Sequence, residues 1–543
     1  MSDLKKIFIS FLVCICFVNI SYSQSVIGKY SVDPNLLKGL NAFTKDIFKA
    51  PIQVTPKTSK FIISNFITDI LKSGDTTWFA TGKGLMRTID HFNSFQYYRG
   101  LEPFGDDDIS GLAIYKNLIV VSTATTQKIS GDDVPVGTGI KVSTDYGSSW
   151  SSYPQPIDSR ADTVITYGSN TIHALAVVVP QQNLSYDINI TKNRNDTTTF
   201  TIWIASYAAG IRKSTDYGNT WQRVVLPPDN LDSVSINGTG YNFTLDPRGN
   251  LNHRGFAVSS LNDSVIFCGT ANGINRSSDF GLSWRKYTYQ NSGTGTSRVA
   301  GNFVVNFKVQ KYNNKNIFWA ATRRAEDNNE KNALTYSSDG GYTWAYTLND
   351  LSPNGISFKD SITYGLTDGG VWRSKFGIFD WSKPSLIYDE QTRDQLSTTK
   401  FYSGNSYGDT LYFGTADGMV RTIENGQPWT SKFKIFRAVA PIDLSSDKKT
   451  YAAPNPFSPD DEVVRIFYKT GKPSSTITIK IFDFGMNHVR TLIQNASRTS
   501  SDELFTQWDG KNNNGAQVAN GVYFYRIEID SDKPVWGKIL VLQ

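Results

Sequence analysis

Aspartate is the residue type through which this sequence could carry out catalysis. Glycoside hydrolysis needs two carboxyl groups on either side of the scissile bond. Asp368, in the segment Thr-Asp-Gly-Gly-Val-Trp at 367–372, and Asp417, which precedes Gly418 one repeat later, are the two carboxylates that we consider for this role. Because an Asp-Gly pair also favours a hairpin turn, we assign no catalytic residue and keep both aspartates as candidates.

The other side chains that could do chemistry lack the necessary spacing. The four histidines do not follow a metal-ligand pattern, and the acidic run at 106–108 lacks the alternating oxygen ligands of a calcium loop. We therefore predict no metal and no cofactor. Four arginines recur just before a repeated Ser or Thr, which indicates a role in the repeat rather than in one central cluster. They are Arg87, Arg276, Arg373 and Arg421.

Composition favours strands over helices. The 543 residues are 39% hydrophobic, 13% aromatic and only 19% charged, a mixture typical of β-rich proteins. The net charge of +6 produces only a weak electrostatic field around a chain of 60.5 kDa. This excludes a strongly basic nucleic-acid-binding protein.

The N-terminus predicts export. Lys5 and Lys6 precede an apolar run at 7–20, and Ser-Tyr-Ser at 21–23 has the pattern of a cleavage site. We expect a signal peptide at 1–23, since the apolar run is shorter than a membrane span. No later segment could cross a membrane as a helix. Cys268 would then be alone in the mature chain, and its apolar surroundings in the sequence predict a buried thiol.

A repeated eight-residue segment organises the middle of the chain. It begins with Ser, has Asp at the third and Gly at the fifth position, and ends in Trp. Asp can accept backbone hydrogen bonds in a tight turn, Gly tolerates a positive φ, and Trp can cover the hairpin. We therefore expect structural roles for these residues. They are Asp145, Gly147 and Trp150; Asp216, Gly218 and Trp221; Asp279, Gly281 and Trp284; and Asp339, Gly341 and Trp344.

Three weaker copies begin at Thr88, Ser374 and Thr422, and two further strand-like runs precede every copy. Each unit therefore has four short antiparallel strands, which is the blade of a β-propeller. For the third unit we expect the inner strand at 172–179. Residues 60–436 hold seven such units, so the predicted fold is all-β: a seven-bladed β-propeller followed by a small Ig-like β-sandwich.

The repeats resemble the Asp-box (BNR) repeats of sialidases, sortilin-type receptors, some β-glucanases and photosystem assembly factors. The resemblance covers the propeller region and implies the fold, but this family contains both enzymes and binding proteins. Asp368 lies where the acidic loop of Asp-box β-glucanases would be, whereas the first repeat has Thr-Gly-Lys-Gly at 81–84. The long insertions fall mainly between blades, with 180–199 on the opposite side, which favours one ligand-binding face.

The C-terminal part forms a separate region. After an extended segment at 24–59 and the propeller at 60–436, a linker is expected at 437–450 and a β-sandwich at 451–543. Its Asn-Pro-Phe opening, Trp508-Asp509-Gly510 and Gly521-Val522-Tyr523 resemble the FlgD Ig-like domain. The domain is also similar to C-terminal sorting domains of type IX secretion cargo, which implies the type IX machinery as a partner in a Bacteroidetes-like bacterium.

The sequence leaves three functions open. The first is a secreted or outer-membrane-surface propeller that binds a glycan or an extracellular protein without catalysis. The second is an extracellular glycoside hydrolase, sialidase-like or β-glucanase-like. The third is an envelope assembly scaffold. The sequence does not identify the ligand, the oligomeric state or whether the C-terminal domain is removed.

Overall fold

A computed structural model describes residues 50–392, 394–438, 450–453, 455–459, 463–499 and 503–542. The expected signal peptide and most of the expected linker at 437–450 lie outside these residues. The chain divides into two compact units. Unit 1 contains the described part of Met1–Lys60, with Ser64–Lys383 and Thr399–Ala416. Unit 2 contains Phe61–Ile63, Pro384–Thr398 and the described part of Asp417–Gln543.

Unit 1 is built from antiparallel sheets that follow one another along the chain. Their strand orders are β2-β6-β5-β4-β3, β1-β10-β9-β8-β7, β13-β14-β15-β16, β17-β22-β21-β20-β19, β23-β24-β25-β26 and β27-β28-β29, and the hairpin β32-β33 follows. An additional small sheet has the order β11-β12-β18, and the 3-10 turn η2 (Leu251–His253) precedes β19.

The strands of unit 1 have the following bounds: β1 (Ile52–Gln53), β2 (Lys57–Ser59), β3 (Ile67–Ser73), β4 (Thr76–Thr81), β5 (Gly84–Thr88), β6 (Phe95–Tyr97), β7 (Asp108–Tyr115), β8 (Leu118–Ile129), β9 (Asp132–Ser143), β10 (Ser149–Tyr153), β11 (Val164–Tyr167), β12 (Asn170–Ala174), β13 (Ser185–Lys192), β14 (Phe200–Ser206), β15 (Gly210–Ser214), β16 (Gln222–Arg223), β17 (Ser233–Val234), β18 (Thr244–Leu245), β19 (Gly255–Ser260), β20 (Ile266–Thr270), β21 (Gly273–Ser277), β22 (Trp284–Tyr287), β23 (Phe303–Tyr312), β24 (Lys315–Arg323), β25 (Ala333–Ser337), β26 (Ala345–Thr347), β27 (Pro353–Lys359), β28 (Ile362–Thr367), β29 (Gly370–Lys375), β32 (Phe401–Tyr407) and β33 (Thr410–Thr415).

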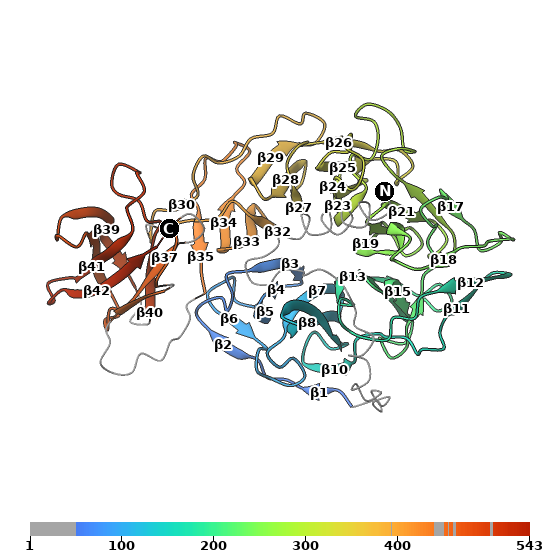
Figure 1. Cartoon of the computed structure of the whole chain (residues 1–543), viewed down its shortest axis with the longest axis horizontal. Helices are drawn as coiled ribbons and strands as arrows, with labels where there is room; N and C mark the ends of the chain where they lie inside the picture. The colour runs from blue at the N-terminus through green and yellow to red at the C-terminus, as the bar shows by residue number, and fades with distance from the viewer. Residues whose placement is uncertain are drawn as a thin grey trace. The chain divides into compact units, whose positions relative to one another are not determined.

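The first strands of these sheets form a closed ring. Among the described residues, β3 contacts β7, β7 contacts β13, and the contacts continue through β19, β23 and β27 to β32, which contacts β3 again. Figure 1 shows these strands around a common centre, with the rest of each sheet extending outward. This radial arrangement is that of a β-propeller, and we call the ring of first strands the hub.

Every hub strand carries a β-bulge close to its first residue. The paired register shifts between Ile67 and Asp69 in β3, and an equivalent shift occurs in the other six hub strands. A bulge adds one residue and redirects its side chain. The seven extra residues are Thr68, Ser110, Tyr186, Phe256, Val305, Asn354 and Tyr402.

The repeated hairpins have one hydrogen-bond pattern in all four full copies. In the first copy, the Ser143 hydroxyl donates to Asp145 Oδ1 at 2.8 Å, and the Gly147 amide donates to Ser143 Oγ at 2.8 Å. The Ser149 amide then donates to Asp145 Oδ1 at 2.8 Å. The copies at Asp216, Asp279 and Asp339 repeat this pattern.

The glycine of the hairpin also meets the preceding sheet. A Cβ at Gly147 would lie 2.5 Å from the ring of Trp78 in β4. A Cβ at Gly281 would lie equally close to the ring of Trp203, and a Cβ at Gly341 equally close to that of Phe267. Gly147 has φ +81°, which agrees with the expectation, but Tyr146 before it also has a positive φ, of 59°. Each hairpin therefore needs two consecutive residues with positive φ.

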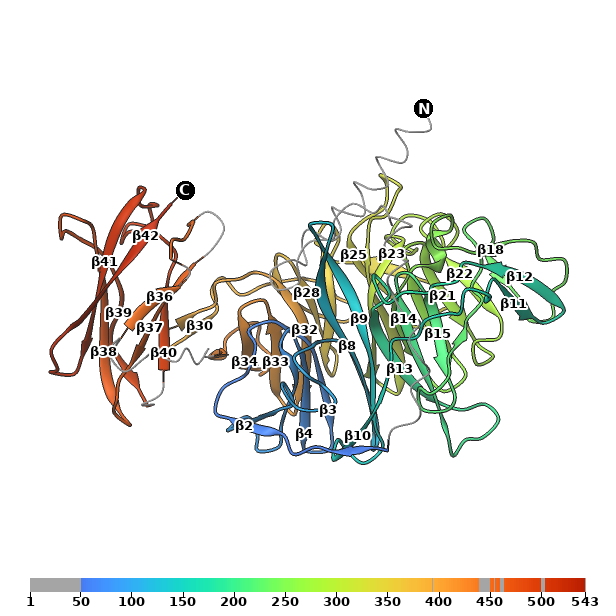
Figure 2. The same cartoon turned by 60° about the horizontal axis from the view of Figure 1, so that its bottom comes forward.

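The expected inner strand at 172–179 was wrong. Residues 170–174 form β12, which pairs with β11 and β18, and the hub strand of this sheet is β13. The segment 180–199, expected as a loop on the opposite side, contains β13. The long connections at 154–184, 224–254 and 288–302 therefore all lead into the start of a hub strand. They lie at the same end of unit 1 as the turn of the long hairpin β8–β9 (Figure 2).

Unit 2 contains two sheets that share one apolar core. The sheets have the orders β36-β37-β40 and β39-β38-β41-β42. Buried residues from both, including Ile466, Ile479, Trp508 and Ile527, form a single cluster, so the sheets pack as a sandwich. The strands of these two sheets are β36 (Thr450–Ala453), β37 (Val464–Lys469), β38 (Ser475–Phe482), β39 (His488–Arg498), β40 (Glu503–Trp508), β41 (Gly521–Ile529) and β42 (Val535–Val541). Unit 2 also contains β30 (Tyr388–Asp389), β31 (Asp394–Gln395), β34 (Gly418–Ile423) and β35 (Lys434–Phe436), which lie outside the sandwich.

Substitution of a hairpin tryptophan by alanine tests this packing. Trp150 is fully buried, and its ring lies 6.3 Å from Trp78. Trp150→Ala should lower the free energy of unfolding by about 3–5 kcal/mol, because it leaves a cavity between two sheets. Trp221→Ala is the matched control, since Trp221 is partly exposed in the same position of its repeat, and it should cost less. Equal losses in denaturant titrations of the two variants would contradict the packing described here.

Candidate functional site

The seven bulge residues line one cavity at the hub of unit 1. The cavity has a volume of about 200 Å³ and lies near the start of the hub strands, where the long connections arrive. All seven bulge side chains belong to its lining, together with Asp69, Asp187 and Asn306 from the positions that follow three of the bulges. We call it the hub cavity.

One side of the hub cavity is aromatic. The Tyr186 and Phe256 ring centres are 5.5 Å apart, and those of Phe256 and Phe303 are 4.6 Å apart. These residues come from the consecutive hub strands β13, β19 and β23. Burial raises the pKa of Tyr186, so its hydroxyl remains neutral. This side offers flat apolar surface with one phenol group.

The other side is polar. Arg323 Nε donates to the Pro353 carbonyl at 3.1 Å, and its guanidinium also donates to Asn354 Oδ1. Asn354 Nδ2 donates to Asp368 Oδ1 at 2.9 Å and to the Phe401 carbonyl at 3.0 Å. Burial, with the charge of Asp368 as the second cause, raises the pKa of Tyr402. These bonds hold a cation, an amide and a carboxylate in a fixed order.

Three polar atoms in or beside the hub cavity are buried without a hydrogen-bond partner. They are the Tyr402 hydroxyl, Asn306 Oδ1 and Asp368 Oδ2. Tyr402 and Asn306 line the cavity, whereas Asp368 stands behind Asn354. Because an unpartnered buried polar atom is costly, a ligand in the cavity would gain hydrogen bonds from the first two.

Charged groups lie across the hub. The Lys308 ammonium of β23 is 3.5 Å from Asp69 Oδ1 of β3, although these strands are not neighbours in the ring. Asp187 accepts the Ile188 and Val258 amides, both at 2.9 Å. Burial, followed by the nearby Asp69 carboxylate, raises the pKa of Asp187 to about 7. Two carboxylates with different electrostatic surroundings therefore line one cavity.

Of the two candidate carboxylates named from sequence, Asp368 lies beside the hub cavity. Asp417 belongs to unit 2, where its side chain is 4% exposed. It accepts hydrogen bonds from Arg437 at 2.9 Å and from Arg465 at 3.0 Å. Burial alone would raise its pKa, but Arg437 and Arg465 lower it to about 2. A carboxylate held this way is poorly suited to proton transfer near neutral pH.

The aspartates of the repeated hairpins have oxygens that are already occupied. Burial alone would raise the pKa of Asp145, but its bonds to Ser149, Ser143 and Ser148 lower it. The pKa of Asp216 and of Asp279 is lowered by equivalent bonds, and that of Asp339 to about 2. Two of the recurrent arginines also hold these hairpins. Arg87 donates a hydrogen bond to the Tyr146 carbonyl, and Arg276 donates one to the Gly340 carbonyl.

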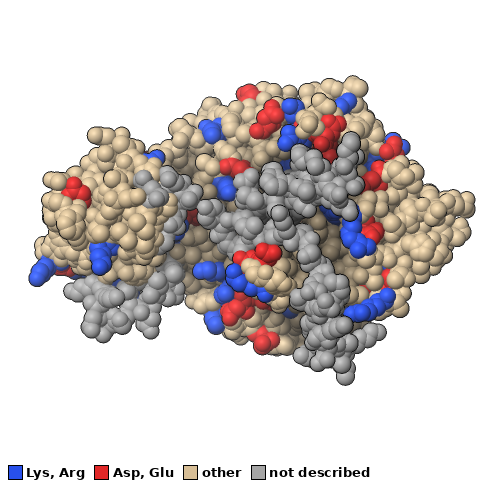
Figure 3. All heavy atoms as spheres, viewed as in Figure 1, with Lys and Arg blue, Asp and Glu red and all other residues tan. Residues whose placement is uncertain are grey.

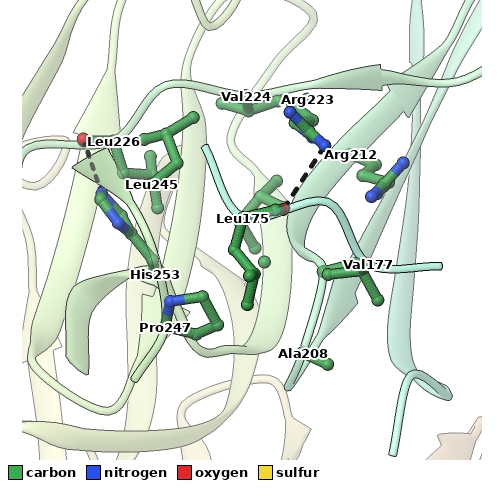
Figure 4. Close-up of a pocket in the computed structure, with 13 residues that line it drawn as sticks. Leu175, Val177, Ala208, Arg212, Arg223, Val224, Leu226, Leu245, Pro247 and His253 are labelled. Atoms are coloured by element: carbon green, nitrogen blue, oxygen red, sulfur yellow. Dashed lines mark hydrogen bonds between the residues drawn. The ribbon is translucent and has the colours of Figure 1, made fainter. Parts of the chain in front are cut away.

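A second cavity lies in unit 1 beside η2. It is about 30 Å³ in volume, which is room for about one water molecule. Figure 4 shows its lining, with His253 at one end and Arg212 and Arg223 at the other. Asp158 binds Arg212 at 2.8 Å and Arg223 at 2.7 Å. Burial lowers the pKa of His253 to about 4, so this imidazole is neutral in the folded protein.

Other classes of site have no support in the described residues. They contain no group of three or more His, Cys, Asp or Glu side chains that could hold a metal ion. Cys268 is buried, which raises the pKa of its thiol. On the face drawn in Figure 3, basic and acidic side chains are interspersed. No helix in the described part of the chain has the length and apolar character that a membrane span requires.

The buried imidazole predicts a loss of stability in acid. The unfolded chain binds a proton at His253 near pH 6.5, whereas the folded chain does so only near pH 4. The unfolding free energy should therefore fall by up to about 3 kcal/mol as the pH decreases through this window. His253→Gln, which keeps a donor for the Leu226 carbonyl, should remove this part of the pH dependence in thermal unfolding. An unchanged pH profile in the variant would show that His253 is not the titrating group.

Comparison with known proteins gives a partial relationship. No family model matches the chain. The xyloglucanase Xgh74A of Acetivibrio thermocellus is 26% identical over 208 residues, which cover 33% of this chain and 22% of the relative. The chain thus spans about a fifth of the curated relative that it matches.

Two solved structures are also similar. The GH74 enzyme of Niastella koreensis is 13% identical with a TM-score of 0.44, covering 90% of this chain and 74% of that one. The GH74 xyloglucanase of Xanthomonas campestris is 11% identical with a TM-score of 0.44, covering 77% and 60%. The β-propeller assignment therefore rests on the closed ring of hub strands itself.

Proposed function

We propose that this protein is an extracellular glycoside hydrolase that acts on a β-linked polysaccharide at the hub cavity. The observation that carries the proposal is the pair of carboxylates, Asp69 and Asp187, that line one cavity in different electrostatic surroundings. The 26% identity with a curated xyloglucanase supports the same class of activity. Neither aspartate was a candidate from sequence, where the non-catalytic function was the first expectation.

The two carboxylates fit the two roles that glycoside hydrolysis requires. An acid must protonate the departing oxygen, and a second carboxylate must assist attack at the sugar carbon. Asp187, with a pKa of about 7, carries a proton for a substantial fraction of the time near neutral pH. Asp69 instead lies 3.5 Å from the Lys308 ammonium, which places a cation beside this carboxyl group. We therefore assign Asp187 as the acid and Asp69 as the assisting carboxylate.

Asp368 acts in this proposal as a positioning residue. It does not line the cavity, but its Oδ1 accepts a hydrogen bond from Asn354, which does. Asn354 also accepts a hydrogen bond from Arg323. Loss of the Asp368 charge would therefore loosen the polar side of the hub cavity without removing either reacting carboxyl group.

Glycan binding without hydrolysis is the second candidate function. Both oxygens of Asp187 accept backbone amides, one of them from the neighbouring hub strand β19. This bridging geometry serves the ring of strands even if no proton is transferred. The two candidates share the hub cavity and differ in whether its carboxylates take part in bond cleavage.

Activity measurements on the purified full chain separate them. We expect release of reducing sugar from soluble β-glucans, with xyloglucan as the first substrate. Asp69→Asn and Asp187→Asn should each lower kcat at least about 100-fold, since each removes one carboxyl group. Asp409→Asn, at an exposed position, is the control and should keep full activity. Glycan binding without any release of reducing sugar would favour the second candidate over hydrolysis.

The finer architecture also belongs to the proposal. We count seven blades, and we identify the repeated hairpins as Asp-boxes. The sandwich of unit 2 is proposed to be an Ig-like domain related to FlgD that serves type IX export to the cell surface. Support comes from the motifs at 455–457, 508–510 and 521–523.

Deletion of the sandwich tests its role in export. Removal of residues 451–543 should leave the propeller inside the cell envelope, whereas the full chain reaches the surface or the medium. Immunoblots of the cell fractions measure this, and a folded propeller in the periplasm would be the expected product. Unchanged export of the shortened chain would contradict the proposed sorting role and would leave the hydrolase proposal untouched.

A further inference from the structure

We infer that the hub cavity binds one neutral pyranose unit at the end of a glycan chain, so that the protein recognises chain ends rather than internal segments. This inference rests on the proposed function and adds the size, charge and position of the sugar that the site takes. Four features of the cavity carry it: its volume, its closure by a salt bridge, its two chemically different sides and its charge balance.

The volume limits the ligand to a single ring. Its volume of about 200 Å³ lies below the range of about 300–1,000 Å³ that is typical of pockets for drug-sized ligands. A monosaccharide is of the appropriate size, and an oligosaccharide is too large. The rest of a glycan chain would have to lie outside, among the long connections that surround the start of the hub strands.

The ion pair between Asp69 and Lys308 restricts passage along the hub. β3 and β23 are separated in the ring by β32 and β27 on one side and by three strands on the other. Their side chains nevertheless approach to 3.5 Å. A polysaccharide could not thread through the hub past this bridge. A chain that enters the cavity along the hub axis therefore does so by one of its ends.

The two sides of the cavity match the two aspects of a pyranose. Sugar C–H groups can pack on the faces of Tyr186, Phe256 and Phe303, since aromatic faces carry partial negative charge. The Tyr402 hydroxyl and Asn306 Oδ1, which belong to the same lining, have no partners. A sugar hydroxyl can accept a hydrogen bond from the first and donate one to the second, which would satisfy both buried groups.

The charges favour a neutral sugar over an acidic one. Arg323 already donates to Pro353 and Asn354, and Lys308 faces Asp69. An added carboxylate would meet Asp69, Asp187 and the carbonyl oxygen of Asn306 without a cation reserved for it. Glucose, xylose or galactose at a chain end fits this balance, whereas a sialic or uronic acid does not.

Product analysis tests the inference. Cello-oligosaccharides of two to six units and xyloglucan polymer are incubated with the full chain, and the products are separated by size. Single sugars should appear from the beginning, and the viscosity of the polymer should fall slowly for each bond that is cleaved. Early release of large fragments with rapid loss of viscosity would show internal cleavage and would overturn the inference.

A binding measurement keeps the inference testable if no hydrolysis occurs. Saturation-transfer NMR with glucose, xylose, galactose and glucuronic acid should show binding of neutral sugars only. Tyr402→Phe should weaken it about three- to tenfold, as expected for one hydrogen bond. Tyr115→Phe, outside the cavity lining, is the matched control. Neutral-sugar binding without hydrolysis would refute the proposed function and sustain this inference, whereas binding of none of the sugars, or binding unchanged by Tyr402→Phe, would overturn the inference.

Discussion

The structure of unit 1 depends on a β-bulge near the start of every hub strand. Sheets that radiate from a common axis bring their first strands together, and full-length side chains from all of them cannot occupy the same space. The bulge adds one residue and redirects its side chain, so that all seven bulge residues line the hub cavity. At three strands the next residue, Asp69, Asp187 or Asn306, lines it as well.

The same constraint explains why hub strands hold polar side chains. Neighbouring hub strands are joined by side-chain bonds: Asn405 donates to the Ile70 carbonyl at 3.0 Å, and Asn189 donates to Ser260 Oγ at 3.1 Å. Asp187 accepts a hydrogen bond from the Val258 amide. The bonds to Ile70 and Val258 use backbone groups of the neighbouring hub strand, whereas the bond to Ser260 joins two side chains. Polar residues at the hub therefore serve the ring and shape the cavity at the same time.

Repeats in the sequence were enough to predict most of unit 1. The spacing of Ser, Asp, Gly and Trp located the hairpins, and apolar runs located six of the seven hub strands and all seven second strands. The third hub strand was missed because β13 contains Asp187, Asn189 and Lys192, whereas only residues 172–174 of the nearby apolar run at 172–179 form a strand, in the small additional sheet. A search for the most apolar segment fails where polar atoms complete the ring.

The site could not be found from sequence because each repeat contributes only one or a few of its residues. Asp69, Asp187, Asn354 and Tyr402 are far apart along the chain, and nothing but the register shift of each bulge brings them to one cavity. Asp368 was a candidate because its Asp-Gly-Gly segment resembles the acidic loop of Asp-box β-glucanases, and it does lie beside the site. Asp417 has a similar turn but binds two arginines instead. Local motifs therefore identified a turn, while the closure of the ring selected the residues that meet.

The contact of Gly147 with Trp78 has an evolutionary consequence. Each of these hairpins fits an aromatic ring that belongs to the previous sheet, so the contact surface is encoded half in one repeat and half in the next. Duplication of a whole repeat preserves this fit, whereas recombination with a different chain at any point between the aromatic residue and the glycine separates the two partners. Descendants of the chain should accordingly not carry bulky residues at both positions. A chimeric propeller will assemble best when its crossovers keep each glycine together with its aromatic partner.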